Sequence, residues 1–582
     1  MSAPTLRAPS IVRRTLTGEP HGWADHVHPV LQRVYAARGV LCPQDAETRL
    51  SGLLPPNAIH GIDAAVELLI DAIRRRLRIV IAADFDCDGA CGAAIATRGL
   101  RALAAQNVGY VVPNRMVHGY GLSPALVETL QPAPDLIVTV DNGIASHAGV
   151  AAAKARGCKV IVTDHHLPGA TLPDANAIVN PQLGPDIVPK SLCGAAVMFY
   201  LLLATRARLR EQGKFASAPE PDFTSLLDLV ALATVADLVP LDRNNRILVE
   251  AGLRRIRASR ACAGIDALIE TACCDARRLE ASDLGYALAP RINAAGRLED
   301  MTLGIECLLT DDTAHARELA AILHGINGER RGLQDAMVGE AEAMLARIDA
   351  NACGVSLFDP AWHQGVIGLV ASKIKERLHR PVIAFAPAGE ESPETLRGSA
   401  RSIPGFHIRD ALAELDAREP GLIRRFGGHA MAAGLSLRVS NYERFAASFD
   451  AIARERIAPE SLQPLLHSDG ELDCGDFDLE LVRQLRAAGP WGQGFPPPLF
   501  DNVFECVGWR RIGAEQRHLR INLRDLRDGR VHTAVQFNAQ ADPPAAPGLR
   551  AAYEMAIDDW QGVESLRLLL RHIEPAWSGD CP

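Results

Sequence analysis

The sequence predicts an α/β protein of several domains, with a parallel sheet in the first half and a small β-barrel at the C-terminal end. Three observations support this fold class. The chain has 582 residues, far more than one domain usually holds. Apolar strand-like runs alternate with helical runs between residues 77 and 163. Short strand-like runs separated by turns follow residue 463.

The alternating region contains the strands and helices of the expected parallel sheet. Its strands are predicted at "LRIVIAA" (Leu77–Ala83), "NVGYVVP" (107–113), "DLIVTV" (Asp135–Val140) and "CKVIVT" (158–163). Helical runs separate them, and in "SPALVETLQ" the first residue suits a helix cap and the proline suits the first helical position. Such an alternation favours a sheet that helices cover on both faces. Ligands bind such sheets beyond the C-terminal ends of the strands.

The remaining chain divides into recognisable parts. Helical patterns dominate from about Cys193 to Ile348, and the stretch 311–348 is long, charged and helical in period despite its glycines. A second α/β pattern begins near Val355. We expect five parts: a mainly helical segment (1–70), the first α/β domain (71–310), a connector helix (311–349), a second α/β domain (350–460) and the barrel (461–582).

Composition narrows the class of protein. Hydrophobic residues make up 48% of the chain, enough for real cores, and no apolar run is long enough to span a bilayer. The N-terminus lacks the apolar stretch of a secretion signal, and the 13 cysteines show no zinc-like spacing. We therefore expect a cytoplasmic, reduced protein. The net charge of −9 argues weakly against nucleic-acid binding, which depends on local charge more than on the total.

Acidic and histidine residues follow three of the predicted strands. Residues two apart on a strand share a face, although the turn at Gly89 will modify this for the first group. Because the C-terminal ends of parallel strands meet at one edge, all three groups should lie close together. The groups are Asp84, Asp86 and Asp88; Asp141; and Asp164, His165 and His166.

This constellation predicts a metal site. Carboxylates with imidazoles suit Mn²⁺, Mg²⁺ or Zn²⁺, and two metals about 3.5–4 Å apart are the usual arrangement for phosphoester hydrolysis. A solvated turn is the more common fate of a lone acidic cluster, but the joint position of the groups at strand ends favours metal. An EF-hand is the competing interpretation of "DFDCDG". It is disfavoured because Ile95, not Glu, stands at the loop's twelfth position.

The motifs of the whole chain resemble a known superfamily. The Asp-His-His run, "DFDCDGA", "VDNGI", "LATVADLVPL" and "PRINAAGRLEDMTLG" are similar to the DHH phosphoesterases. "WHQGVIGLVASKI", "LRGSARSI" and "FGGHAMAAG" resemble the companion DHHA1 domain. With "WGQGFPPPLF", the set looks specifically like the RecJ family of bacterial single-strand-specific 5′→3′ exonucleases and covers nearly the whole chain. This resemblance implies a DHH domain, a DHHA1 domain and an OB-like barrel.

The resemblance also implies roles for residues of the metal site. His166 would be a ligand or a contact to the scissile phosphate, and it would act in catalysis with Asp141 and Arg297. Asp84 would bind metal directly or support the site. Several relatives carry a metal-binding His where this chain has Ala82, so one metal would have fewer protein ligands. The implied ligands are Asp84, Asp86, Asp88, Asp141, His165 and Asp237.

A second set of residues is expected to contact the nucleic acid. Glycines in "RRFGGHAMAAG" would let backbone N–H groups approach a phosphate, and two nearby arginines with a histidine would form a pocket for a 5′-phosphate. "WRRIGAEQRHLRINLRDLRDGR" holds seven arginines and three acids, which suits a groove for a single strand, although a solvated barrel face is the commoner fate. A surface ion pair with Glu299 or Asp300 is the alternative for Arg297, and a solvated loop position is the alternative for Arg115. The set is Arg115, Arg297, Arg397, Arg401, Gly427, Gly428, His429, Arg517 and Arg520.

The expected function is that of a metal-dependent exonuclease that degrades single-stranded DNA 5′→3′ to mononucleotides. Two divalent ions, Mn²⁺ or Mg²⁺, would activate water and steady the leaving oxygen. The resemblance implies a role in recombination and repair, with a single-strand-binding protein and a RecQ-type helicase as partners, and monomer is the default state. The alternatives are an enzyme for short oligonucleotides or cyclic dinucleotides, an inorganic pyrophosphatase and a non-catalytic DNA-binding scaffold.

Overall fold

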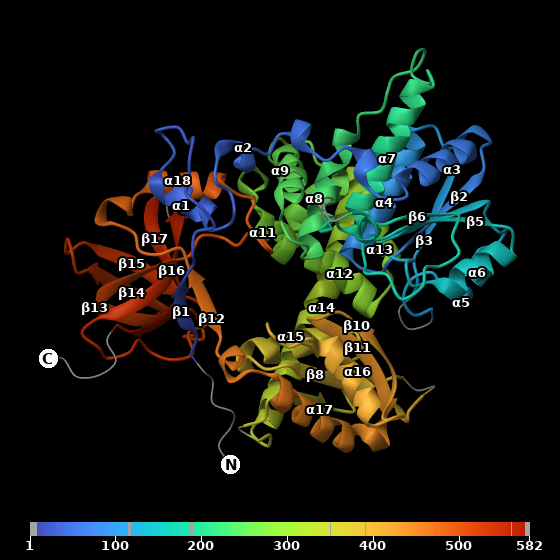
Figure 1. Ribbon diagram of the computed structural model, residues 1–582. Helices are drawn as coiled ribbons and strands as arrows, with labels where there is room; N and C mark the ends of the chain where they lie inside the picture. Colours follow the sequence, from blue (N-terminus) through green and yellow to red (C-terminus); the bar gives the residue numbers. More distant parts are fainter. Residues whose placement is uncertain are drawn as a thin grey trace. The chain divides into compact units, whose positions relative to one another are not determined.

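The computed structural model describes residues 8–114, 118–185, 190–349, 351–389, 392–559 and 562–576. The described chain forms two compact units (Figure 1). Unit 2 comprises residues 16–327 and 483–497, and unit 1 comprises residues up to 15, 328–482 and 498 onward. Both units are therefore assembled from segments that lie far apart in the sequence.

Unit 2 contains the predicted parallel sheet. Its strand order is β3-β2-β4-β5-β6, and every neighbouring pair is parallel. Helices α5 and α6 pack on one face, while α3, α4 and α7 contact the other face or its edge, so both faces are covered as expected. The strands are β2 (Arg78–Ala83), β3 (Asn107–Val111), β4 (Leu136–Val140), β5 (Lys159–Thr163) and β6 (Ala177–Val179).

Helices build the rest of unit 2, and a π-helical turn (Leu284–Leu288) leads directly into α12. The predicted cap of α5 is present, because the Ser123 side chain accepts a hydrogen bond from Leu126 N. The helices are α1 (Pro29–Ala36), α2 (Pro43–Ala46), α3 (Ile62–Arg74), α4 (Cys87–Ala102), α5 (Pro124–Thr129), α6 (His147–Ala155), α7 (Gly194–Glu211), α8 (Leu227–Ala236), α9 (Arg243–Arg257), α10 (Ala263–Ala272), α11 (Ala281–Asp283), α12 (Ala289–Leu298) and α13 (Thr302–Leu309).

The expected connector is one helix, α14 (Thr313–Leu345), of 33 residues. Each glycine in a helix interior costs up to about 1 kcal/mol relative to alanine. The four glycines of α14 nevertheless leave it unbroken. No helix in the described ranges is long and apolar enough to cross a membrane.

Unit 1 contains a second, mixed sheet with strand order β10-β11-β9-β8-β7. The β7–β8 pair is parallel and the other pairs are antiparallel. Helices α16 and α17 bury the apolar face of this sheet, and α15 contacts β8 and β9. The elements are β7 (Val355–Phe358), α15 (Ile367–Leu378), β8 (Val382–Pro387), β9 (Thr395–Arg401), α16 (Ile408–Arg418), β10 (Ile423–Gly428), β11 (Ala432–Arg438) and α17 (Tyr442–Arg456).

The C-terminal strands of unit 1 close into the expected barrel, in the order β13-β14-β15-β17-β16. The β15–β17 pair is parallel, and the other neighbouring pairs of the barrel are antiparallel. Closure removes the unpaired edges of an open sheet. The strands are β12 (Leu465–Ser468), β13 (Phe500–Ile512), β14 (His518–Asp525), β15 (Val531–Gln536), β16 (Leu549–Asp558) and β17 (Ser565–Pro575). Helix α18 (Leu479–Ala487) begins in unit 1 and ends in unit 2.

Two segments depart from the expected division into consecutive parts. The N-terminal segment was expected to be mainly helical, yet it also supplies β1 (Ser10–Arg13), which pairs in parallel with β12. Residues 483–497 belong to unit 2, where Tyr35 donates a hydrogen bond to Ala488 O and its ring packs against Trp491. Both segments lie in their units through contacts with residues more than 400 positions away in the sequence, and local sequence patterns do not reveal such contacts.

A buried carboxylate fastens β1 to the barrel. Asp501 lies 3.0 Å from Arg13 Nη2 and 2.8 Å from Arg550 Nη2, and it accepts a hydrogen bond from Ser468. Burial alone would raise the pKa of Asp501, but the hydrogen bonds from Arg13, Ser468 and Arg550 bring it below its ordinary value. This group stabilises the fold only while it is ionised.

We expect Asp501→Asn to destabilise unit 1 by roughly 2–3 kcal/mol at neutral pH, since charge-assisted hydrogen bonds are removed. The lowered pKa fixes the pH dependence. The stabilisation is complete above the unfolded-state pKa of about 4 and disappears as pH falls through the lower folded-state pKa. Thermal unfolding of both proteins between pH 7 and pH 3 checks this, and a difference that persists unchanged at the acid end would contradict it.

Candidate metal centre

The first acidic group stands in a turn, not on a strand as its spacing suggested. Strand β2 ends at Ala83, and Asp86 caps helix α4 by accepting a hydrogen bond from Gly89 N at 3.0 Å. Asp88 lies in the first turn of α4 and accepts hydrogen bonds from Gly194 N and Ala195 N at 2.7 and 2.9 Å. The strand-to-helix turn, together with the start of α7, therefore positions these carboxylates.

Asp141 follows β4 in a left-handed backbone conformation, with φ of 64°. Non-glycine residues adopt this conformation uncommonly, and Asp and Asn tolerate it best. The start of α7 packs directly on it, because a β-carbon added to Gly194 would lie 2.6 Å from Asp141 Cα. Next to it, Asn142 donates hydrogen bonds to Ala82 O and Val140 O, which ties the ends of β2 and β4 together.

The Asp-His-His run follows β5, and its aspartate organises the other two residues. Asp164 Oδ1 accepts hydrogen bonds from the backbone N–H groups of His165 and His166, and lies 2.7 Å from His166 Nδ1. Its other oxygen accepts one from Ile144 N at 2.8 Å. Burial raises the pKa of Asp164, but the bond and charge of His166, together with the Ile144 hydrogen bond and His165, outweigh burial and lower this pKa. The same bond raises the pKa of His166 to about 9 against the opposing effect of burial.

His165 joins the strand-end groups to the end of helix α8. His165 Nε2 lies 3.1 Å from Asp141 Oδ1 and 3.5 Å from Asp237 Oδ2. Asp237 directly follows the apolar helix α8. Three overlapping groups have ligand atoms within 4.8 Å of one another: Asp84, Asp86 and Asp141; Asp88, His165 and Asp237; and Asp141, His165 and His166. The structure thus brings together every residue predicted as a metal ligand.

The electrostatics of this cluster fit divalent cations. Burial, and then repulsion from Asp86, raise the pKa of Asp88 to about 7. Burial and the neighbouring carboxylates raise the pKa values of Asp141 and Asp237 well above their ordinary range. Asp141 Oδ1 is buried, and apart from the contact with His165 Nε2 it accepts no hydrogen bond from the described residues. Carboxylates crowded at this density are stabilised when cations share them, and oxygen with imidazole donors suits Mn²⁺ or Mg²⁺.

Ala82 cannot contribute to this cluster. Its side chain belongs to the apolar core that α5 and α6 form against the sheet. The ligands therefore come from the turns beyond the strands and from the end of α8.

Helix α12 places Arg297 beside the same turn. Asn293 Oδ1 accepts a hydrogen bond from Cys87 N at 2.9 Å, and a β-carbon on Gly296 would collide with Phe85 O. Arg297 follows Asn293 by one helical turn and is half-buried. Arg115, the other arginine predicted near this rim, lies outside the described residues.

The phosphate-binding residues predicted in unit 1 lie on one sheet. Arg397 and Arg401 share a face of β9, and Gly427 and Gly428 end β10, two strands away across β11. His429 begins the turn between β10 and β11. Arg397 Nη1 donates to Gln364 Oε1 at 2.9 Å, and Arg401 Nη1 donates to Ser399 Oγ at 3.1 Å. A β-carbon on Gly427 or Gly434 would meet nothing within 4 Å, so this face is open at these two glycines, whereas Gly368 of α15 lies against Ser399 and Arg401.

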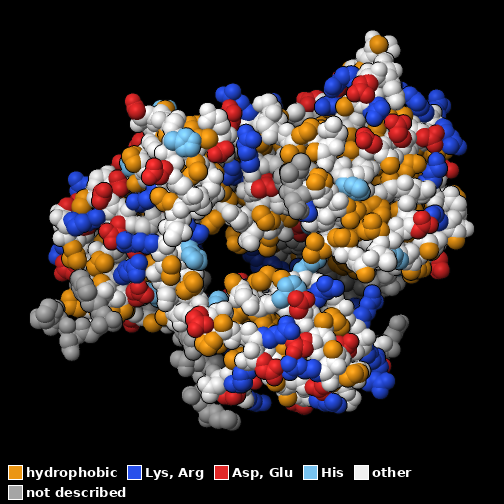
Figure 2. Space-filling view, viewed as in Figure 1, with side chains coloured by type: hydrophobic (Ala, Val, Ile, Leu, Met, Phe, Trp, Pro, Cys, Tyr) orange, Lys and Arg blue, Asp and Glu red, His pale blue; other side chains and the backbone are white. Residues whose placement is uncertain are grey.

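The arginines of the barrel are less available than their number suggests. Arg517 pairs with Glu515 at 2.6 Å, and Arg524 pairs with Glu505 at 2.8 Å. Figure 2 shows acidic and basic side chains intermixed on the visible barrel surface. Arg520, by contrast, faces Arg510 across the β13–β14 pair, and neither has an ion-pair partner in the described ranges. The local excess of positive charge is therefore concentrated at this pair.

Sequence reasoning did not assign three residues that shape the centre. Asp164 was recognised as part of the motif, but its role in orienting His166 was not. Gly194 donates its N–H to Asp88, which lies 106 residues earlier in the chain. Asn293 accepts a hydrogen bond from Cys87 N, which lies 206 residues earlier. Their only sequence signal is their place within runs of small residues.

Comparisons with known proteins agree with this architecture. Family models match at residues 78–234 (DHH family, N-terminal domain), 349–455 (DHHA1 domain) and 468–572 (RecJ OB domain). The chain is 48% identical to the single-stranded-DNA-specific exonuclease RecJ of Salmonella typhimurium, covering 94% of this chain and 96% of the relative. It is 46% identical to that of Escherichia coli strain K12, covering 97% and 99%.

A solved structure gives the same result. The crystal structure of RecJ in complex with Mn²⁺ from Thermus thermophilus superposes with a TM-score of 0.80 at 33% identity, covering 95% of this chain and 76% of that one. The similarity thus spans both units and the barrel. The chain belongs to the RecJ family of DHH/DHHA1 phosphoesterases.

Proposed function

We propose that the chain is a metal-dependent exonuclease that degrades single-stranded DNA from the 5′ end to mononucleotides. The observation that carries this proposal is the cluster of buried carboxylates and histidines at the ends of β2, β4, β5 and α8. The names of the RecJ relatives support the single-strand specificity. The 5′→3′ direction and the mononucleotide product are our inference from the family resemblance.

The residues of the centre have separate roles in this proposal. Asp84, Asp86, Asp88, Asp141, His165 and Asp237 would hold Mn²⁺ or Mg²⁺. Divalent ions bound in this way supply an activated water and neutralise charge on the leaving oxygen. Asp164 fixes the ring of His166 and raises its pKa, and a protonated His166 would donate a hydrogen bond to the scissile phosphate. Arg297 would add a second positive charge from α12.

The second α/β domain would hold the 5′ end of the strand. Its open glycine face, with Arg397 and Arg401, lets a phosphate approach the backbone closely. His429 and the neighbouring glycines would complete this contact. The barrel would contact another part of the strand through Arg520, with Arg517 as a weaker contact because Glu515 already pairs with it.

The cellular setting belongs to the proposal as well. We infer a cytoplasmic, monomeric enzyme of recombination and repair that acts with a single-strand-binding protein and a RecQ-type helicase. These inferences rest on the family resemblance.

Charge reversal on the barrel tests its role as a strand contact. We expect Arg510→Glu with Arg520→Glu to raise KM for a strand of about 40 nucleotides about tenfold or more, since an unpaired cationic pair becomes anionic. The value of kcat should change little. Steady-state kinetics on long and on very short strands measures this. The matched control is Arg524→Gln, because Arg524 already pairs with Glu505; an equal effect of the control would contradict the assignment.

Substrate competition separates this function from its alternatives. The full-length protein with Mn²⁺ is offered single-stranded DNA, duplex DNA, short oligoribonucleotides, a cyclic dinucleotide and pyrophosphate, and kcat/KM is compared. We expect single-stranded DNA to exceed each of the others by at least about 100-fold, because the glycine face and the barrel add contacts that small substrates cannot make. Preferential hydrolysis of a small substrate would overturn the proposal.

A further inference from the structure

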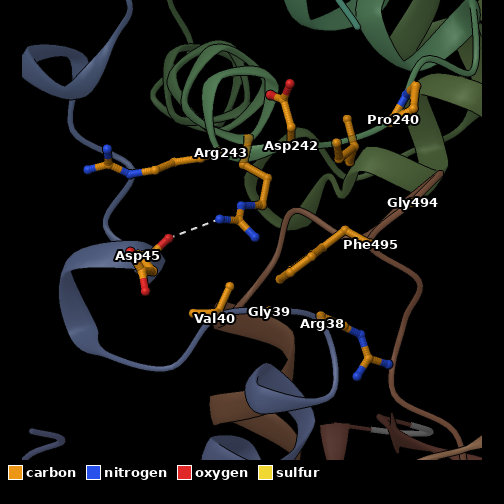
Figure 3. A pocket seen from close by; sticks show the side chains of 11 residues that line it. Arg38, Gly39, Val40, Asp45, Pro240, Asp242, Arg243, Gly494 and Phe495 are labelled. Atoms are coloured by element: carbon orange, nitrogen blue, oxygen red, sulfur yellow. Dashed lines mark hydrogen bonds between the residues drawn. The ribbon is translucent and has the colours of Figure 1, made fainter. Parts of the chain in front are cut away.

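Unit 2 contains a cationic cavity that the metal centre does not include. Its volume is about 320 Å³, and it lies between the start of α9, the segment that follows α1 and the loop at 494–495 (Figure 3). Phe495 and Val40 form apolar parts of its wall. Its charged lining residues are Arg38, Asp45, Asp242, Arg243 and Arg246.

Arg246 is the buried cation of this cavity. Only 7% of the residue is exposed, and its guanidinium lies 4.2 Å from the centre of the Phe495 ring. Its Nη2 group donates a hydrogen bond to Asp45 O at 2.9 Å. Within the described ranges no other acceptor contacts this side chain, and no carboxylate lies within ion-pair distance. A guanidinium has five N–H donors, and Arg246 lines the cavity, so a ligand there has further donors to bind.

Arg243 adds a second positive charge that lacks a carboxylate. Its Nη2 donates a hydrogen bond to a backbone oxygen, Gln44 O, at 3.3 Å. The two aspartates of the lining are engaged elsewhere: Asp242 caps α9 by accepting from Asn245 N, and Asp45 accepts from Cys42 Sγ. The charges of Asp242 and Asp45 act on Arg246 from a distance, but neither carboxylate pairs with Arg246 or Arg243 among the described residues, so the cavity offers N–H donors and an excess of positive charge.

This chemistry selects an anion. A buried guanidinium without a carboxylate is unfavourable unless an anion enters beside it, and its planar donors match phosphate oxygens in pairs. The volume is sufficient for a phosphate with the attached sugar. The cavity is also close to the reaction, because Pro240 in its wall follows Asp237 by three residues, a span of at most about 11 Å.

We propose that this cavity binds a phosphate group of the nucleic acid through Arg246 and Arg243, as a site separate from the metal centre. The proposal rests on the proposed function and deepens it, since it adds a strand contact within unit 2. A phosphate on a free nucleotide has the same chemistry, so the experiment includes both sources. If the arginines only hold Phe495 and the segment at 44–45 in place, their charge is needed for folding and not for binding.

The first test measures binding without hydrolysis. The full-length protein in EDTA is titrated with a fluorescent strand of about 20 nucleotides at several salt concentrations, and separately with thymidine 5′-monophosphate. We expect Arg243→Gln to weaken strand binding severalfold, and Arg243→Gln with Arg246→Lys to weaken it about tenfold. The dependence of log K on log salt should become shallower by about 0.7 for each phosphate that the variant no longer binds. Loss of nucleotide binding with unchanged strand binding would assign the site to free nucleotides.

The controls separate binding from folding and from the proposed function. Arg260→Gln removes an exposed arginine of unit 2 that does not line the cavity, and it should leave both affinities unchanged. Arg243 is exposed, so its variant should keep the thermal unfolding midpoint of the parent. Unchanged affinity of Arg243→Gln for both the strand and the nucleotide overturns the proposal. A polyglutamate peptide serves as an anion without phosphate, and the proposal is also overturned if the variant weakens only the binding of this peptide. Failure of the wild type to hydrolyse DNA would contradict the proposed function, whereas the binding titration in EDTA would still test the cavity.

Discussion

Asp141→Asn should lower kcat for single-strand hydrolysis by about 10³-fold or more, while binding of the strand remains measurable. The loss follows because a metal supplies several kcal/mol of transition-state stabilisation, and Asp141 belongs to two of the three overlapping groups of prospective ligands. Asparagine is preferable to alanine here, since it keeps the side-chain volume and tolerates the left-handed backbone at φ of 64°. Single-turnover kinetics with a 5′-labelled strand measures the effect.

Two further measurements keep this result interpretable. The variant should unfold at a temperature equal to or above that of the parent in EDTA, because a buried carboxylate with a raised pKa is removed. Isothermal titration with Mn²⁺ should show weaker metal binding than in the parent. If the variant hydrolyses DNA at a rate near the wild-type value, Asp141 is not a metal ligand that catalysis requires.

Gly194→Ala should lower kcat by about 100-fold although it removes no functional group. The new β-carbon would lie 2.6 Å from Asp141 Cα and 2.8 Å from Asp141 Oδ1, so one of the two segments must move. The same residue donates its N–H to Asp88 at 2.7 Å, and a shift of α7 would disturb both carboxylates. Misplacement by about 1 Å is enough to cost about 100-fold in rate. Steady-state kinetics and Mn²⁺ titration measure this effect.

Gly109→Ala is the matched control for this prediction. Gly109 lies on β3 of the same sheet, and a β-carbon there would meet nothing within 4 Å. Its activity should equal that of the parent. Normal activity of Gly194→Ala, with its fold intact, would show that α7 does not set the geometry of the centre.

The sequence predicted the parallel sheet, and the gathering of acidic and histidine side chains at its edge, because both depend on local patterns. Buried parallel strands have continuous apolar runs, as in "LRIVIAA", and their C-terminal ends share one edge, so Asp141 and His165 had to lie near each other. The barrel was predictable for a similar reason, from short strand-like runs with turns. Asp237 depended on the motif resemblance, since nothing local links the end of α8 to the sheet.

Other features could not be predicted, because they arise from long-range packing. The pairing of β1 with β12 and the place of residues 483–497 in unit 2 join segments on opposite ends of the chain. The same limit applies to charge: the arginine-rich strand suggested a basic groove, but cross-strand and turn partners such as Glu505 and Glu515 neutralise much of it. Composition counts charges and does not show which of them are paired.

The most direct measurement of the central claim uses single strands labelled at the 5′ or the 3′ end. The full-length protein is incubated with each strand in Mn²⁺, beside a duplex and an EDTA control. The account predicts immediate release of labelled mononucleotide from the 5′-labelled strand, progressive shortening of the 3′-labelled strand, and no release from the duplex or in EDTA. Hydrolysis that persists in EDTA, or release that begins at the 3′ end, would contradict it.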